Sequence, residues 1–190
     1  MTIKYLAGVD EVGRGCLAGP VISAAVILKK SAKKDLLKDS KTLSPSKRIY
    51  LAQYIVKASY SIGIGIATNE EIDDLNIHNA SLLSMERAIN NLNIEPDLIY
   101  VDGLFKPPTK YKTQCFIKGD SLKPSISAAS IIAKVVRDNE MMYLNSLINV
   151  YQFNEHKGYP TKSHKLALNT FGPSIYHRKS FRPVKDLIGI

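Results

Sequence analysis

Residues 8–15 read Gly-Val-Asp-Glu-Val-Gly-Arg-Gly, and the fold can be worked out from this stretch. The apolar residues 3–9 predict a short β-strand that ends at Asp10. A second apolar run at 20–28 predicts another strand, and the glycines between the two runs predict a tight turn. Asp10 and Glu11 are therefore expected to follow a strand directly, at a turn that leads into a second strand.

Periodicity predicts alternating helices and strands along the rest of the chain. Ser44 and Pro45 form a helix-start signal, because serine caps a helix and proline fits its first turn. The expected helices span residues 48–58, 69–92 and 127–147, and the further expected strands span 59–67, 97–101 and 114–117. Residues 154–173 are polar and interrupted by glycine and proline, and residues 174–190 match no pattern. This order favours an α/β protein with a mixed sheet flanked by helices.

The chain has 190 residues, which suits one domain with a sizeable buried core. Its two cysteines, Cys16 and Cys115, do not make a disulfide framework and suit a reducing compartment. The first residues lack the apolar core of a signal peptide, and no apolar run approaches the length of a membrane span. We therefore expect a cytoplasmic protein that is not bound to a membrane.

The charge balance indicates a class of partner. Lys and Arg number 26 against 17 Asp and Glu, which gives a formal net charge of +9. A basic surface favours polyanions, with nucleic acid first among them. A basic protein without such a partner fits the same numbers, so the charge alone does not decide the function.

Four acids stand out because each follows a predicted strand: Asp10, Glu11, Asp102 and Asp120. Acids at successive strand ends converge at one edge of a sheet, where each raises the pKa of its neighbours. Divalent cations relieve that repulsion, and two of them about 4 Å apart can bracket a phosphodiester. A solvated turn or capping role explains any single Asp, but it explains the pair before the glycine turn less well.

The turn Gly13-Arg14-Gly15 suits contact with a sugar-phosphate backbone. Glycines allow close approach of the backbone, whose N–H groups can face phosphate or ribose oxygens. Arg14 can pair with a phosphate through two hydrogen bonds, and a loop that senses a 2′-hydroxyl distinguishes RNA from DNA. The glycine spacing and the following strand argue against dinucleotide binding.

Taken together, these ordered motifs resemble those of the ribonuclease HII family. The matching blocks are Asp10-Glu11-Val12-Gly13-Arg14-Gly15 with Leu17-Ala18-Gly19-Pro20-Val21, Asp39-Ser40-Lys41-Thr42-Leu43, Tyr100-Val101-Asp102-Gly103, Lys118-Gly119-Asp120, residues 127–138, and His156-Lys157-Gly158-Tyr159-Pro160-Thr161. One departure is Cys16, which stands where proline is more often expected and affects the stiffness of the turn. The related ribonuclease HIII family has an extra N-terminal domain, for which we expect no room before Asp10.

The resemblance implies an α/β ribonuclease H-like fold, with a mixed five-stranded sheet flanked by helices and a small C-terminal helical region. It implies a catalytic domain at residues 1–150 and a helical and loop extension at 151–190 packed on the same domain. The implied enzyme hydrolyses the RNA strand of RNA–DNA hybrids and nicks duplex DNA at embedded ribonucleotides. Its products would carry 5′-phosphate and 3′-hydroxyl ends. We expect a monomer with no membrane partner.

The resemblance also implies roles for particular residues. The implied catalytic residues and ligands for one or two Mg²⁺ or Mn²⁺ ions are Asp10, Glu11, Asp102 and Asp120. The implied substrate-binding residues are Gly13, Arg14, Gly15, Lys41 and Tyr159, with Tyr159 stacking at the RNA–DNA junction. Taken alone, Lys41 would be read as a solvated lysine.

Other candidate residues have two interpretations each. Asp138 either supports the site from behind the ligands or pairs with Arg137 or Lys134 on the helix surface. The four histidines show no metal-binding spacing, and only His156 is placed to face a substrate. Serines near the start of the long helix, Ser130 among them, fit capping and packing better than nucleophilic catalysis.

Two further hypotheses compete with a ribonuclease. One keeps the fold and changes the substrate to that of another metal-dependent nuclease, such as a junction resolvase. The other is a basic binding module without catalysis. Carboxylates near phosphates weaken binding unless a metal intervenes, so the four acids argue against the second. The tail segment 181–184 is compatible with docking a partner or with packing on the domain.

Overall fold

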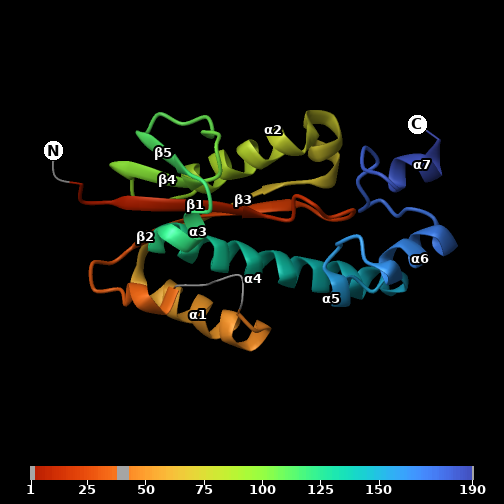
Figure 1. Ribbon diagram of the computed structural model, residues 1–190, viewed down its shortest axis with the longest axis horizontal. Helices are drawn as coiled ribbons and strands as arrows, with labels where there is room; N and C mark the ends of the chain where they lie inside the picture. Colours follow the sequence, from red (N-terminus) through yellow and green to blue (C-terminus); the bar gives the residue numbers. More distant parts are fainter. Residues whose placement is uncertain (1–2, 38–42, 190) are drawn as a thin grey trace.

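The computed structural model describes residues 3–37 and 43–189, and a mixed five-stranded sheet lies at its centre (Figure 1). The strands are β1 (Leu6–Val12), β2 (Val21–Leu28), β3 (Ser59–Ala67), β4 (Leu98–Asp102) and β5 (Thr113–Phe116). Their order in the sheet is β3-β2-β1-β4-β5. The first three strands pair antiparallel, whereas β4 joins β1 and β5 in parallel. The mixed sheet predicted from the sequence is confirmed.

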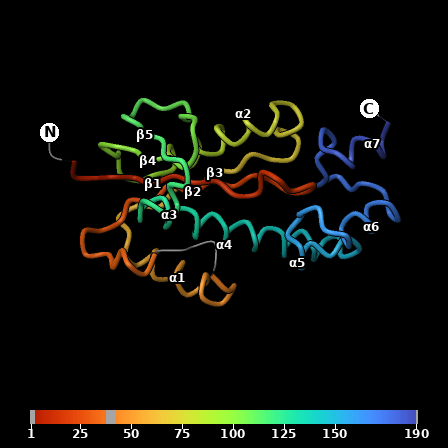
Figure 2. The backbone as a smooth tube through the Cα atoms, in the orientation of Figure 1, coloured from red at the N-terminus to blue at the C-terminus, as the bar shows by residue number. Residues whose placement is uncertain are grey.

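Helices cover both faces of the sheet. They are α1 (Pro45–Ala58), α2 (Asn69–Asn90), α3 (Gly119–Leu122), α4 (Pro124–Leu147), α5 (Phe153–His156), α6 (Lys162–Phe171) and α7 (Val184–Ile188), with the short 3-10 helices η1 (Lys34–Leu37) and η3 (Asn149–Tyr151). Helix α2 lies on one face, and α4 and α1 lie on the other (Figures 1 and 2). The helix start predicted at Ser44 is confirmed, because its side chain accepts the Lys47 N–H and Pro45 occupies the first turn.

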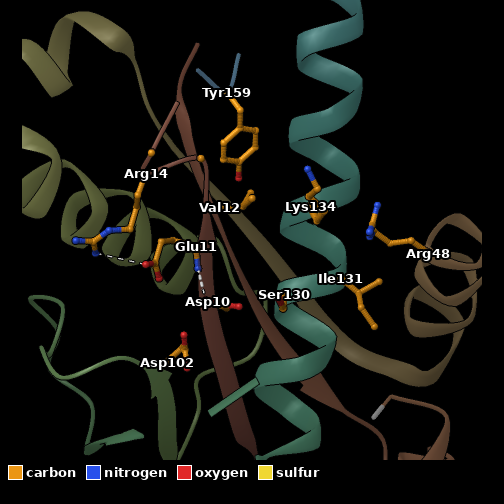
Figure 3. A pocket seen from close by; sticks show the side chains of 12 residues that line it. Asp10, Glu11, Val12, Arg14, Arg48, Asp102, Ser130, Ile131, Lys134 and Tyr159 are labelled. Atoms are coloured by element: carbon orange, nitrogen blue, oxygen red, sulfur yellow. Dashed lines mark hydrogen bonds and ion pairs between the residues drawn. The ribbon is translucent and has the colours of Figure 1, made fainter. Parts of the chain in front are cut away.

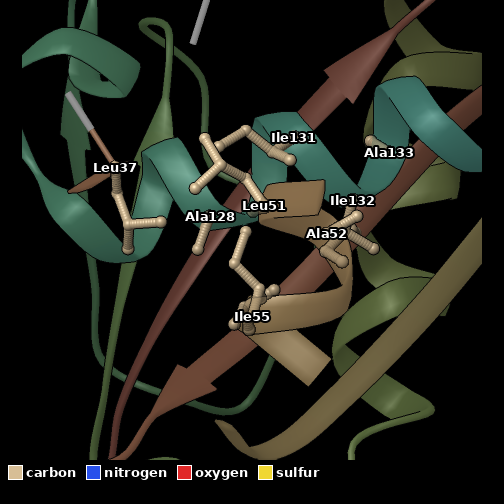
Figure 4. Packing of buried hydrophobic residues seen from close by; sticks show 11 residues of the cluster. Leu37, Leu51, Ala52, Ile55, Ala128, Ile131, Ile132 and Ala133 are labelled. Carbon is tan, nitrogen blue, oxygen red and sulfur yellow. The ribbon is translucent and has the colours of Figure 1, made fainter. Parts of the chain in front are cut away.

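Each face of the sheet has its own hydrophobic core. On one face Leu51 and Ile55 of α1 meet Ile131 of α4 over β2 (Figure 4). On the other face Met85 and Ile89 of α2 pack on residues of β1, β2 and β4. Burial of these side chains, at roughly 25 cal/mol per Å² of apolar surface, holds the helices to the sheet.

Strand β3 lies where a strand is predicted, and its small residues alternate with isoleucines. Its small residues face α2, where a Cβ on Gly65 would lie 2.0 Å from Ser84 O and one on Gly63 would lie 2.1 Å from Ala88 O. Its isoleucines Ile62 and Ile64 face the opposite core instead. The glycines are therefore required for the close approach of α2.

Three boundaries differ from the prediction. Asp10 and Glu11 lie within β1 and not after it, because pairing with β2 continues to Val12. Helix α4 begins at Pro124, three residues before the predicted start, since proline suits the first turn of a helix. The polar segment 154–173 contains the end of α5 and all of α6.

The C-terminal region packs against the end of the sheet that carries the glycine-rich turn. Val184 of α7 is buried with Leu17 and Leu168, and Phe181 packs against them and against Val21. The tail segment thus packs on the domain; the division at residue 150 stays a prediction. Among the described residues, none of the helices has the length and apolar character needed to span a bilayer.

Candidate active site

A cavity of about 400 Å³ lies between β1, the glycine-rich turn, α4 and the start of α1 (Figure 3). Its lining residues are Asp10, Glu11, Val12, Gly13, Arg14, Gly15, Arg48, Asp102, Ser130, Ile131, Lys134 and Tyr159. Seven of the predicted site residues are among these twelve: the three acids on β1 and β4, the turn 13–15, and Tyr159. The fold therefore brings most of the predicted site into one cavity.

Strand pairing positions three carboxylates. Val9 of β1 is in register with Val101 of the parallel strand β4, so Asp10 and Asp102 are neighbours across the sheet. Asp10 Oδ1 accepts the Glu11 N–H at 2.8 Å, and Asp102 Oδ1 accepts the Gly119 N–H at 2.6 Å. The carboxylates of Asp10 and Asp102 are thus held by the sheet and by backbone donors.

The electrostatics of this acidic wall favour a cation. Burial raises the pKa of Asp10 well above its usual value, and the negative charges of Glu11 and Asp102 raise it further. Burial also raises the pKa of Glu11; Arg14 opposes this and Asp102 adds to it. Glu11 Oε2 is buried and has no hydrogen-bond partner among the described residues. A divalent cation would relieve the repulsion and satisfy this oxygen, so the residues fit such an ion.

The acidic wall is open rather than a closed metal cage. Within residues 3–37 and 43–189, no group of three or more His, Cys, Asp or Glu side chains is arranged to hold a metal ion by itself. Mg²⁺ and similar ions usually keep several waters and take one or two carboxylates plus phosphate oxygens. An ion at this wall would therefore complete its coordination with water and substrate.

Asp120 does not line this cavity. It is the second residue of α3, is 2% exposed, and lines a separate cavity of about 50 Å³ with Ser127 and Leu37. Its neighbour Gly119 donates to Asp102, which keeps α3 close to the end of β4. The predicted role of Asp120 as a fourth ligand stays a prediction.

The glycine-rich turn is built against a buried arginine. Gly13 has φ +100°, and a Cβ placed on it would lie 2.2 Å from Arg137 Nε. Only glycine fits there, for both the backbone conformation and the contact. A Cβ on Gly15 would meet no atom within 4 Å, so that side of the turn is open. Arg14 is half exposed and forms a loose ion pair with Glu11, with 3.4 Å between Nη1 and Oε1.

A basic wall faces the carboxylates across the cavity. Arg48 of α1 and Lys134 of α4 line it, and both pair with Asp138, at 3.7 Å and 2.7 Å respectively. Asp138 does not line the cavity; of its two suggested partners it takes Lys134 and not Arg137. Asp138 therefore forms ion pairs with both cations from outside the cavity.

Tyr159 stands at the far end of the cavity from Asp102 (Figure 3). The residue is about one third exposed, with Lys134 Nζ 5.7 Å and the Arg137 guanidinium 5.9 Å from the ring centre. The exposed part of the ring is available to a flat partner such as a base. Lys41, the remaining predicted substrate contact, lies outside the described residues.

Comparison with known proteins agrees with this geometry. A family model for Ribonuclease HII matches residues 7–184. A relative named Ribonuclease HII from Pelagibacter ubique is 53% identical over 98% of this chain and 100% of its own length. The crystal structure of the ribonuclease H2 from Pyrococcus horikoshii OT3 superposes with a TM-score of 0.80 at 26% identity, covering 96% of both chains. The chain belongs to the ribonuclease HII family.

Membership of the ribonuclease HII family settles the class of enzyme. The chain is a ribonuclease H, a hydrolase that acts on RNA–DNA hybrids, and its fold is ribonuclease H-like. The hypotheses of a junction resolvase and of a non-catalytic binding module are therefore wrong. The crystal structure of Bst-RNase HIII in complex with Mn²⁺ shares the fold, with a TM-score of 0.70 at 20% identity, over 97% of this chain and 69% of that one.

Some residues of the site were not found from the sequence of this ribonuclease HII family member. Ser130 lines the cavity, and its hydroxyl hydrogen bonds to Asp10, which goes beyond the capping and packing expected for it. Arg48 carries no signal beyond helix periodicity, and Lys134 is expected only as a helix-surface partner of Asp138. The one sequence sign for such a cation is its spacing from an acid: Lys134 lies one helical turn before Asp138.

The histidine next to the Tyr159 loop is structural. His156 does not line the cavity; it is buried and stacks on His164, with 4.3 Å between ring centres. His164 Nδ1 lies 2.9 Å from Tyr159 O, and its Nε2 lies 3.1 Å from His177 Nε2. Burial lowers the pKa of His164 to about 4 and that of His177 to about 3. Neutral histidines therefore tie the tyrosine loop to the C-terminal tail.

Two buried arginines hold the backbone around the cavity, and both are 0% exposed. Arg137 donates to Ala18 O, Pro20 O and Lys157 O, at 3.1, 3.0 and 2.7 Å. It thereby joins the segment that follows the turn to the loop that carries Tyr159. Arg178 donates to the turn from the tail, a segment in which the sequence matched no pattern. Burial lowers the pKa of Arg178 to about 10, so it remains charged at neutral pH.

Proposed function

We propose that this ribonuclease H cleaves the RNA strand of hybrids and also nicks duplex DNA at a single embedded ribonucleotide, leaving 5′-phosphate and 3′-hydroxyl ends. The observation that carries the proposal is one cavity that holds both a buried carboxylate wall and the turn 13–15. The wall suits metal-assisted hydrolysis, and the open turn suits recognition of a ribose. A site that reads one ribose does not require a long hybrid.

Asp10, Glu11 and Asp102 would hold Mg²⁺ or Mn²⁺, with Asp120 as a further ligand. Such ions lower the pKa of an attacking water and stabilise the leaving oxygen. The Mn²⁺ complex of Bst-RNase HIII supports this choice of cation. Ser130 hydrogen bonds to Asp10 and orients its carboxylate.

The remaining lining residues would bind the nucleic acid. Arg48 and Lys134 bind backbone phosphates, and Asp138 holds them in place. The loose pair of Arg14 with Glu11 frees the Arg14 guanidinium for a phosphate once a cation neutralises the glutamate. Tyr159 stacks on a base at the junction between RNA and DNA. The high net positive charge supports affinity for a duplex.

A nicking assay tests the proposal. A DNA duplex with one ribonucleotide is incubated with the protein and Mg²⁺ or Mn²⁺, beside the same duplex without the ribonucleotide and a reaction with EDTA. We expect a single nick at the ribonucleotide, only with metal, and no cut in the all-DNA duplex. Cleavage of both duplexes at similar rates, or of long hybrids alone, would contradict the proposal. End-labelling of the fragments checks the 5′-phosphate and 3′-hydroxyl.

A further inference from the structure

Arg178 is a buried cation that donates to the glycine-rich turn from the far end of the chain. Its Nη2 donates to Gly13 O at 2.7 Å, and its Nη1 donates to Arg14 O at 2.9 Å. Its Nε and Nη2 also donate to Gly19 O, at 3.0 and 2.9 Å. In the part of the chain that the structure describes, no carboxylate forms an ion pair with it. Backbone carbonyls thus take the place that an acid usually occupies beside a buried arginine.

These hydrogen bonds fix the direction of two peptide groups. A trans peptide is planar, and its N–H points away from its C=O. Since the carbonyls of Gly13 and Arg14 point at Arg178, the next N–H groups along the chain, those of Arg14 and Gly15, point the opposite way. Both residues line the catalytic cavity.

The two N–H groups have no partner within the described protein. Among residues 3–37 and 43–189, neither the Arg14 nor the Gly15 N–H donates a hydrogen bond. The space beside Gly15 is open, because a Cβ placed there meets no atom within 4 Å. Successive backbone N–H groups that face one concavity form a site for oxyanions and hydroxyl oxygens.

We infer that Arg178 is a positioning residue for substrate recognition, which turns the Arg14 and Gly15 N–H groups toward oxygen atoms of the ribose and its phosphate. The inference rests on the proposed function of the turn 13–15. Arg178 touches no reacting atom and acts through the carbonyls it holds. The C-terminal tail, which lies outside the carboxylate wall, thereby takes part in reading the substrate.

The chemistry of arginine explains why this residue suits the task. Its planar guanidinium has donors fixed in different directions, so one side chain can hold three carbonyls of a turn at once. Lysine has a compact charge and would hold fewer of them. Methionine would fill similar space and donate nothing. These two substitutions separate the donor geometry from the volume.

The test compares Arg178→Met and Arg178→Lys with the matched control Arg182→Met. Arg182 lies in the same tail, its side chain is 82% exposed, and it pairs only with Asp186 in the described part of the chain. Affinity is measured by fluorescence anisotropy, with Ca²⁺ in place of Mg²⁺, for a duplex with one ribonucleotide and for the same all-DNA duplex. The ratio of the two affinities is the readout, because a purely structural defect lowers both together.

We expect Arg178→Met to reduce that ratio about tenfold, the loss of roughly one hydrogen bond to the substrate. Arg178→Lys should fall between it and the wild type, and Arg182→Met should leave the ratio unchanged. An unchanged ratio in Arg178→Met would overturn the inference. If Arg178→Met does not fold, as shown by circular dichroism, an unchanged ratio in Arg178→Lys overturns it instead.

Amide hydrogen exchange gives a readout that does not require cleavage. In the wild type we expect the Arg14 and Gly15 amides to exchange fast and to be protected when the ribonucleotide duplex binds. In Arg178→Lys this protection should be weaker. If the wild type shows the protection but does not nick, the proposed function fails and the inference stands. If it nicks and neither substitution changes the ratio or the protection, the inference fails alone.

Discussion

The acidic wall and the glycine-rich turn face the same cavity but are built in opposite ways. Asp10, Glu11 and Asp102 lie on adjacent paired strands, and the ladder of the sheet holds them. The turn has no ladder; Arg178 holds it through the carbonyls of Gly13 and Arg14. Arg137 holds the segment just after it, through Ala18 O, and the Tyr159 loop, through Lys157 O.

This contrast separates residues that can be substituted while the fold stays intact from residues whose substitution also disturbs the fold. A carboxylate on a strand can be replaced while the strand remains paired, so its removal affects chemistry. A buried arginine holds several acceptors at once, so its removal leaves carbonyls without partners and affects stability. Substitutions on the two sides of this division should therefore change different properties of the protein.

Asp10→Asn should disable the acidic wall and leave the turn intact. We expect cleavage to fall by at least ~10³-fold, because loss of several kcal/mol of charge stabilisation costs tenfold per about 1.4 kcal/mol. Binding to a hybrid should stay near the wild-type level. Single-turnover rates and anisotropy measure the two, with the exposed Asp74→Asn as the matched control. Near-normal turnover would show that Asp10 is not a ligand.

The same variant should be more stable than the wild type at neutral pH. The pKa of Asp10 is raised in the folded state above its ordinary 3.8, so the buried carboxylate destabilises the fold at pH 7. Below about pH 4 the carboxyl is protonated in both states, and the advantage of the asparagine variant disappears. Thermal unfolding at about pH 7 and about pH 3.5 measures this, and an equal difference at both would contradict it.

Arg137→Met should disrupt the turn and the Tyr159 loop together. Three carbonyls lose their donor, which costs about 3 kcal/mol of unfolding free energy at about 1 kcal/mol each. Urea denaturation measures the loss, with Arg182→Met as the control. A change below about 0.5 kcal/mol, the range of ordinary surface substitutions, would mean that the carbonyls find water instead.

Tyr159→Ala tests a substrate-binding residue that belongs neither to the acidic wall nor to the glycine-rich turn. A stacked base is worth about 1–3 kcal/mol, so nicking at one embedded ribonucleotide should fall about tenfold or more. Long hybrids offer many registers and should lose less. Rates on both substrates, measured in parallel, decide the matter. Equal losses would count against a role at the junction and favour general support of the cavity wall.

Acid should weaken the histidine link between the Tyr159 loop and the tail. His164 and His177 have folded pKa values of about 4 and about 3, below their ordinary 6.5, so stability present above pH 6.5 is lost as the pH falls toward 4. Each contributes at most about 1.4 kcal/mol per pH unit. In His164→Asn the amide can still donate to Tyr159 O, and the dependence on pH should be shallower. If stability depends on pH equally steeply in His164→Asn and in the wild type, His164 is not the source of this pH dependence.

Much of the fold was predictable because it depends on local patterns. The strand–helix order and the cap at Ser44 follow from periodicity and from side chains next to the helix start. The predicted end of β1 was wrong, because pairing with β2 carries the strand through Asp10 and Glu11. The cap Ser44 lies next to the helix that it starts. The partner of β1 is a separate strand, so the local pattern of β1 does not show where pairing ends.

The residue types along the chain are enough to specify the chemistry of this protein. The acids, the glycine-rich turn and the order of the motifs resemble those of the ribonuclease HII family, and that resemblance is confirmed. Which other side chains share the cavity depends on the tertiary structure. Arg48 and Ser130 line it, Asp138 pairs with Arg48 behind it, and Arg178 donates to the carbonyls of the turn. Residues far apart in the chain form those contacts, so no local pattern could predict them.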